Sequence, residues 1–158
     1  QLEQIISDVI FAKDDAQPQF RLGDNIVRRY QHRLFLTPMF TDISQEYIEA
    51  RFNHPFSLPD HLGTLLLQKT TEKMTALWQD ENGNTHKETL TLPLEGTKVW
   101  IRFRYSGKVK LTPNDVNKDI KKVWQQLNVA PWQRQRIPLI FYDDKLQSAV
   151  GFFTVFQN

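Results

Sequence analysis

The 158-residue sequence contains no cysteine. This absence excludes disulfides, thiolate nucleophiles and cysteine-based zinc sites, and it agrees with a reducing cytoplasm. No apolar run approaches the roughly 18–20 residues that a membrane-spanning helix needs. We therefore predict a cytoplasmic protein without a membrane partner. The sequence also begins without methionine, which leads us to expect a chain cut from inside a longer one.

Catalytic and metal-binding motifs are equally scarce. The six glycines are scattered, so the sequence contains no glycine-rich loop of the kind that holds phosphate. It contains no Gly-x-Ser-x-Gly elbow, and its paired carboxylates, Asp14-Asp15 and Asp143-Asp144, fall where turns are predicted. The histidines lack the paired spacing of metal ligands: His32, His54, His61 and His86. We predict no catalytic residue, no metal site and no activity for this chain alone.

Basic residues are concentrated in one segment. The net charge of the whole chain is only +2, but residues 98–136 carry ten basic residues against Asp115 and Asp119, a net charge of +8. The remainder of the chain must then carry −6. A basic segment in an otherwise acidic chain indicates a polyanionic partner, with nucleic acid first. The alternative is a solvated, lysine-rich face without a partner.

Apolar spacing predicts the elements of the first half. Residues 2–12 have helical periodicity, and residues 19–36 are typical of β structure around a turn at Gly23-Asp24-Asn25. Residues 39–61 are interpreted as an irregular connector. From residue 62 onward the pattern is again that of strands, with a hairpin turn at Asn82-Gly83, because both residues tolerate positive φ.

A main helix is predicted over about 113–127. Thr112 is a suitable N-cap, Pro113 suits the first helical position, and Asn128 suits a left-handed cap. Its apolar stripe would consist of Val116, Ile120, Val123, Trp124 and Leu127. The predicted fold class is α+β: a short N-terminal helix and β-hairpin, then a mixed sheet packed against this helix.

Several basic residues are candidates for contacts with phosphate. Lys118, Lys121 and Lys122 would project together from the helix, since residues three or four apart share a face. Arg102 and Arg104 share one face of a predicted strand. If the helix packs on that sheet, both sets would form a basic rim with affinity for phosphates but no sequence readout.

Trp132 lies two residues before Arg134, and an exposed pair of this kind would stack on a terminal base or ribose. The alternative is that Trp132 and Trp124 both belong to the core. We favour the core for both, because tryptophan is usually substantially buried.

A longer pattern resembles a known family. Residues 119–134 closely resemble the C-terminal domain of bacterial tRNA(Ile)-lysidine synthetases, in which a Leu-Lys-Lys-like helix precedes Gly-Val-Pro-Pro-Trp and an arginine. Residues 137–142 and 146–156 match the continuation of that domain, and Val27-Arg28-Arg29-Tyr30 looks like the end of the family's central domain. One departure is Asn128-Val129-Ala130, where Gly-Val-Pro is more usual.

The resemblance implies part of a ligase. In that family an N-terminal domain with a Ser-Gly-Gly-x-Asp-Ser loop uses ATP, with magnesium expected, to activate the wobble cytidine of a minor isoleucine tRNA, and free lysine then attacks. This sequence lacks that loop. The resemblance therefore implies a tRNA-gripping part that is inactive alone, in which Lys121, Lys122 and Arg134 are the leading candidates for acceptor-stem contact. Lys118, Arg102, Arg104 and Trp132 rank below them.

The same resemblance predicts the domain organisation. Residues 1–38 would end the central substrate-binding domain, residues 39–61 would form the connector, and residues 62–158 would form the tRNA-binding domain. Two alternatives are a free-standing nucleic-acid-binding module and a protein–protein interaction domain with a basic face. An interaction domain would show a shallower salt dependence and no competition by tRNA.

Overall fold

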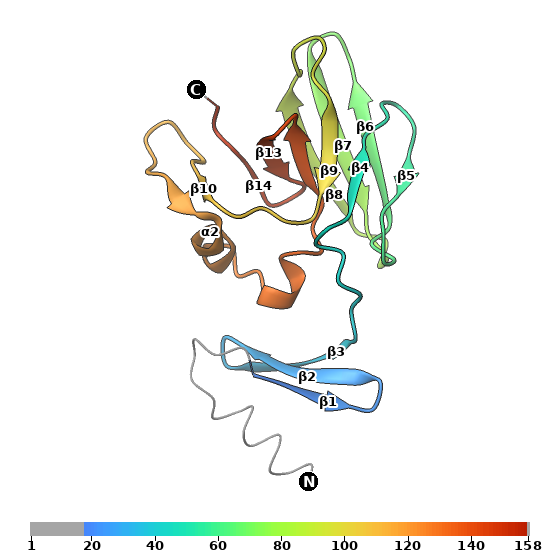
Figure 1. The fold of residues 1–158 in the computed structure, drawn as a ribbon, viewed down its shortest axis with the longest axis vertical. Coiled ribbons are helices and arrows are strands. Elements are labelled where there is room, and N and C mark those ends of the chain that lie inside the picture. Colours follow the sequence, from blue (N-terminus) through green and yellow to red (C-terminus); the bar gives the residue numbers. More distant parts are fainter. Residues whose placement is uncertain (1–17, 158) are drawn as a thin grey trace. The chain divides into compact units, whose positions relative to one another are not determined.

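The computed structural model describes residues 18–157 of the chain, which divides into two compact units, residues 1–41 and 42–158. The helix predicted over residues 2–12 lies outside the described residues. The described part is mostly β, with fourteen strands, one α-helix and one short 3-10 helix (Figure 1). None of its helices is long and apolar enough to cross a membrane.

The first unit contains a three-stranded antiparallel sheet. Its strands are β1 (Gln19–Leu22), β2 (Asn25–Tyr30) and β3 (Arg33–Pro38), in that spatial order. The turn predicted at residues 23–25 joins β1 to β2, and Gly23 has the positive φ of 63° that such a tight connection favours. The third strand extends the predicted hairpin.

The second unit begins with a four-stranded antiparallel sheet in the order β5-β6-β7-β8. The Asn82-Gly83 turn joins β7 to β8 as predicted, and the Asp80 carboxylate holds it by accepting hydrogen bonds from the backbone nitrogens of Asn82 and Asn84. Burial alternates along β7, which gives the sheet one buried face. The strands are β5 (Phe56–Ser57), β6 (Thr64–Lys69), β7 (Lys73–Gln79) and β8 (Thr85–Thr91).

A five-stranded sheet in the order β14-β13-β12-β9-β4 completes the main framework, and β10 and β11 form a small separate pair. All these strand pairs are antiparallel, so the predicted mixed sheet is wrong. The strands are β4 (Tyr47–Glu49), β9 (Val99–Arg102), β10 (Lys108–Val109), β11 (Lys118–Asp119), β12 (Leu139–Tyr142), β13 (Lys145–Ala149) and β14 (Phe153–Thr154).

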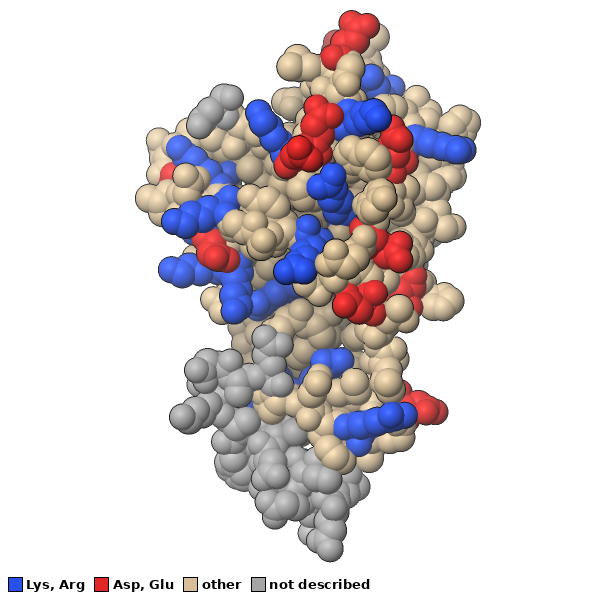
Figure 2. Space-filling view, viewed as in Figure 1, with Lys and Arg blue, Asp and Glu red and all other residues tan. Residues whose placement is uncertain are grey.

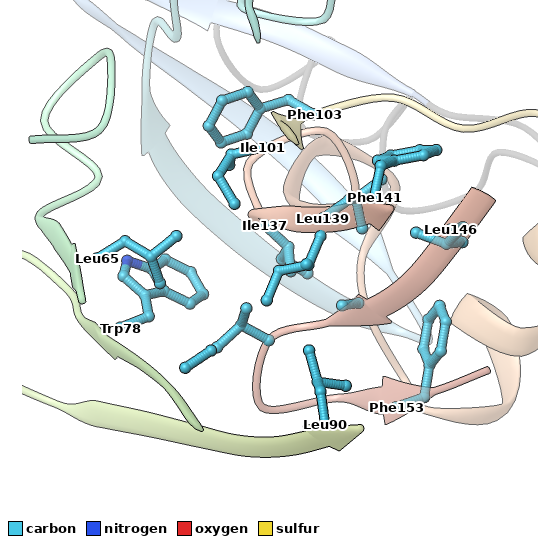
Figure 3. Packing of buried hydrophobic residues seen from close by; sticks show 14 of the residues in the cluster. Leu65, Trp78, Leu90, Ile101, Phe103, Ile137, Leu139, Phe141, Leu146 and Phe153 are labelled. Atoms are coloured by element: carbon cyan, nitrogen blue, oxygen red, sulfur yellow. The ribbon is translucent and has the colours of Figure 1, made fainter. Parts of the chain in front are cut away.

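The two main sheets share one hydrophobic core. Figure 3 shows Leu65, Trp78 and Leu90 of the four-stranded sheet beside Ile101 and Leu139 of the five-stranded sheet. The buried Trp78 indole donates a hydrogen bond to the backbone carbonyl of Leu62 at 2.6 Å. Its one polar atom is thereby satisfied inside the core.

The helix is shorter than the sequence predicted. Helix α2 covers Ile120–Gln126, not residues 113–127, and Asp119 rather than Thr112 is its N-cap. Lys118 and Asp119 pair with β10, so their backbone groups are committed to a strand before the helix begins. Val116, expected on the apolar stripe, is 74% exposed. The predicted fold class, a mixed sheet packed on one main helix, is therefore corrected to an antiparallel β framework with a seven-residue helix.

The segment predicted as a connector, residues 39–61, contributes strands to the second unit from residue 42 onward. Strand β4 pairs with β9, and β5 pairs with β6. Ile43 and Leu58 are buried in the shared core. These strands are only three and two residues long, and hydrogen bonds to distant partners position them. Local pattern alone does not reveal them.

Candidate nucleic-acid interface

Helix α2 has one buried and one exposed face. Ile120, Val123 and Trp124 pack into the core, while Lys121 and Lys122 are exposed. The spacing of three and four residues puts the apolar side chains on one stripe and leaves the lysines outside it. The Asp119 carboxylate accepts a hydrogen bond from the backbone nitrogen of Lys121 at 2.9 Å and fixes the start of the helix.

The β10–β11 pair brings two more lysines to the beginning of this helix. Lys108 lies opposite Asp119 in the strand register, and Lys118 lies opposite Val109. We call the four lysines of these elements the basic surface: Lys108, Lys118, Lys121 and Lys122. Figure 2 shows basic side chains gathered over the part of the second unit that contains β10 and α2.

The lysines of the basic surface differ in their availability. The ammonium group of Lys118 lies 3.3 Å from the Asp115 carboxylate and donates to the Gln126 side chain at 3.2 Å. Lys118 therefore links the turn that contains Asp115 to helix α2. Within the part of the chain that the structure describes, Lys121 and Lys122 form no ion pair. Both charges are thus available to an external anion.

Arg134 and Trp132 follow the helix. Asn128 has the predicted left-handed conformation, with φ of 58°, and reverses the chain into a 3-10 helix, η1 (Pro131–Gln133). The Nε of Arg134 donates to the backbone carbonyl of Val129 at 2.9 Å, which anchors the guanidinium beside the end of α2. Trp124 is in the core as we favoured, whereas Trp132 is only half-buried.

Arg102 and Arg104 belong to a different surface feature. Both line a hollow of about 740 Å³, to which no residue of α2 contributes. We call it the aromatic hollow, because its walls include Tyr47, Trp100, Tyr105 and Phe141. Strand β9 positions part of it: Val99 and Ile101 point into the core, and the alternate residues Trp100 and Arg102 point outward.

The charges around the aromatic hollow are mixed. The Arg102 guanidinium lies 5.0 Å from the centroid of the Phe141 ring and 3.9 Å from the Asp144 carboxylate, whose side chain is 98% exposed. Hydrogen bonds from Ser44 and, to a smaller extent, the charge of Arg104 lower the pKa of the Asp42 carboxyl. The two arginines are therefore partly compensated by local acids.

One residue counted in the basic segment serves the fold instead. Arg136 is 9% exposed, and its Nη1 lies 2.6 Å from Oδ2 of Asp60. Conversely, sequence reasoning missed Tyr47 of the aromatic hollow, because that residue falls in the segment interpreted as a connector.

Among residues 18–157 no group of three or more His, Cys, Asp or Glu residues is arranged to hold a metal ion.

Comparison with family models defines the class of both ends of the chain. Residues 1–35 match a model described as the TilS substrate binding domain. Residues 99–157, which carry β9, the basic surface and β12 to β14, match a model described as the TilS substrate C-terminal domain. The chain thus falls in the class of substrate-binding regions.

Whole-chain relatives identify the family. A tRNA(Ile)-lysidine synthase of Actinobacillus succinogenes is 51% identical over 99% of this chain and 36% of the relative. That of Haemophilus influenzae (strain PittGG) is 49% identical over 100% of this chain and 35% of the relative. That of Proteus mirabilis is 35% identical over 100% and 33%. The chain belongs to the tRNA(Ile)-lysidine synthase family and spans about a third of the length of these curated relatives.

Proposed function

We propose that this chain holds the tRNA substrate of a tRNA(Ile)-lysidine synthase. The carrying observation is that Lys121 and Lys122 are both exposed on α2, within the segment that matches the substrate C-terminal domain. A lysine that neutralises a phosphate releases condensed counterions, which supplies affinity independent of sequence. Paired RNA suits such a surface, because A-form stems are recognised mainly by shape, phosphates and 2′-hydroxyls.

The finer assignment is a grip on the body and acceptor stem of a minor isoleucine tRNA. Lys121 and Lys122 are the proposed main phosphate contacts. Arg134 supports them, because its anchored guanidinium follows the same helix. Lys118 ranks lower, since its ammonium group is already bonded to Asp115 and Gln126.

The reaction of the longer protein is proposed to take place outside this chain. There, ATP and magnesium would activate the tRNA cytidine, and free lysine would be joined to it in the cytoplasm. The residues present here do not fit ATP, because the sequence has no glycine-rich phosphate loop. The chain's own contribution is to bind and orient the tRNA, and the chain alone is expected to be inactive.

A titration of labelled tRNA tests this function. The minor isoleucine tRNA and an elongator methionine tRNA are each titrated with the chain at low and high salt. We expect binding that weakens steeply with salt and favours the isoleucine tRNA. Equal, salt-sensitive binding to both would refute the proposed selectivity and leave an electrostatic clamp. Absence of binding at low salt would refute the tRNA assignment.

A further inference from the structure

Tyr47 is an aromatic side chain without an evident structural reason for its position. It is 66% exposed at the edge of the five-stranded sheet, where β4 is the last strand (Figure 1). Its ring forms an edge contact with Trp100, with centroids 5.8 Å apart and planes at 69°. The contact holds the Tyr47 ring at the wall of the aromatic hollow and leaves much of its surface open to solvent.

Arg102 adds a second flat group beside Tyr47. The two residues are direct partners in the β4–β9 register, so their side chains lie next to each other on the same face of the sheet. The guanidinium of Arg102 lies over the Phe141 ring, 5.0 Å from its centroid. An aromatic ring and a guanidinium plane side by side are the groups on which unpaired nucleic-acid bases stack.

The polar groups of the aromatic hollow suit the rest of a nucleotide. Arg104 is exposed, and the charge of Asp42 compensates it only through space, without a salt bridge among the described residues, so its guanidinium can still contact a phosphate. Asp144, on the wall, can accept hydrogen bonds from an exocyclic amine. The volume of about 740 Å³ lies within the range of small-ligand sites, roughly 300–1,000 Å³.

We propose that the aromatic hollow binds an unpaired nucleotide of the RNA partner, with the base stacked beside Tyr47 and Arg102 and the phosphate at Arg104. This inference rests on the proposed tRNA-holding function, and it assigns unpaired and paired RNA to two different surfaces of the chain. Bases inside a stem are already stacked and cannot offer their faces, so the hollow selects an end, loop or bulge. The basic surface takes the phosphates of paired RNA.

The probes are a fluorescent single-stranded oligoadenylate and a blunt-ended RNA duplex, each titrated with the full 158-residue chain. Tyr47→Ala is expected to weaken oligoadenylate binding at least about fivefold, the lower end of the contribution of one stacked base. Tyr47→Phe, which keeps the ring, and Leu94→Ala, which removes an 83% exposed apolar side chain outside the hollow, should retain the parent affinity. Duplex binding should not change in any of the three variants.

The outcomes separate the two proposals. If oligoadenylate does not bind the parent chain, or binds Tyr47→Ala as well as the parent, the nucleotide site is overturned. Duplex and tRNA binding would in that case still support the proposed function. If duplex and tRNA do not bind but oligoadenylate binds the parent and not Tyr47→Ala, the proposed tRNA grip fails and the nucleotide site stands. A thermal melt of each variant verifies that Tyr47→Ala is folded.

Discussion

Replacing Arg136 by methionine is expected to destabilise the second unit strongly. The Arg136 side chain is 10% exposed and that of Asp60 is 18% exposed, so both charges are largely removed from water. The guanidinium contacts Asp60 twice, with Nη1 at 2.6 Å from the carboxylate and Nη2 at 3.1 Å from the backbone carbonyl. Arg136→Met keeps the apolar stem but leaves the Asp60 carboxylate without this partner.

Removing one partner of a buried pair costs about 3–5 kcal/mol. For a chain of this size, each kcal/mol lowers the melting temperature by about 2–4 °C, so we expect a decrease of roughly 6–20 °C. The matched control is Arg102→Met, because Arg102 lies 3.9 Å from an Asp144 side chain that is 98% exposed. A surface pair of that kind contributes about 0–1 kcal/mol.

Denaturant unfolding followed by tryptophan fluorescence gives the free energy of unfolding of each variant. The signal reports on the second unit, because all four tryptophans belong to it. Adding Asp60→Ala to Arg136→Met should recover part of the stability, because the largely buried carboxylate that lost its Arg136 contact is then removed. A destabilisation by Arg136→Met no larger than that by Arg102→Met would refute the structural role assigned to the pair.

Four further changes test the fold. Trp124→Ala should cost about 3–5 kcal/mol, as for buried tryptophans generally, and a melting temperature within about a degree of the parent would contradict its burial. Gly63→Ala should abolish cooperative unfolding in a circular-dichroism melt, because Gly63 has φ of 94° and a Cβ there would lie 1.9 Å from the Gln79 carbonyl. Burial raises the pKa of Tyr142 to about 12, so a spectrophotometric titration should lose its most alkaline step in Tyr142→Phe. Burial raises the pKa of Glu88 in the folded chain above its value in the unfolded chain. The free energy of unfolding therefore decreases as the pH rises through the interval between these two pKa values. Glu88→Gln should raise the free energy of unfolding at pH values above that interval and leave it unchanged below it.

The sequence predicted the elements whose causes are local. The turn at Asn82-Gly83, the alternation along β7 and β9, and the left-handed Asn128 all follow from the preferences of a few adjacent residues. The failures involve distant partners. Thr112 and Pro113 form a plausible helix start, but pairing of Lys118 and Asp119 with β10 commits the following residues to a strand.

The candidate site was predicted unevenly for the same reason. Lys121 and Lys122 remain within α2, but Lys118 lies in β11, so the prediction that all three lysines share one face of the helix is wrong. The aromatic hollow was not predictable, since Tyr47 and Arg102 become neighbours only through the pairing of β4 with β9, across more than fifty residues of chain. Charge counting also included Arg136, whose partner Asp60 is distant in sequence.

Charge reversal at the two helix lysines tests the tRNA assignment most directly. The measurement is the dissociation constant for the minor isoleucine tRNA over a series of salt concentrations, for the parent chain and for Lys121→Glu with Lys122→Glu. We predict much weaker binding in the double variant at low salt and little change in melting temperature, because both side chains are exposed. The salt dependence should become shallower by about one unit of log–log slope for each phosphate that the variant no longer neutralises. Unchanged dissociation constants in a folded double variant would contradict the account.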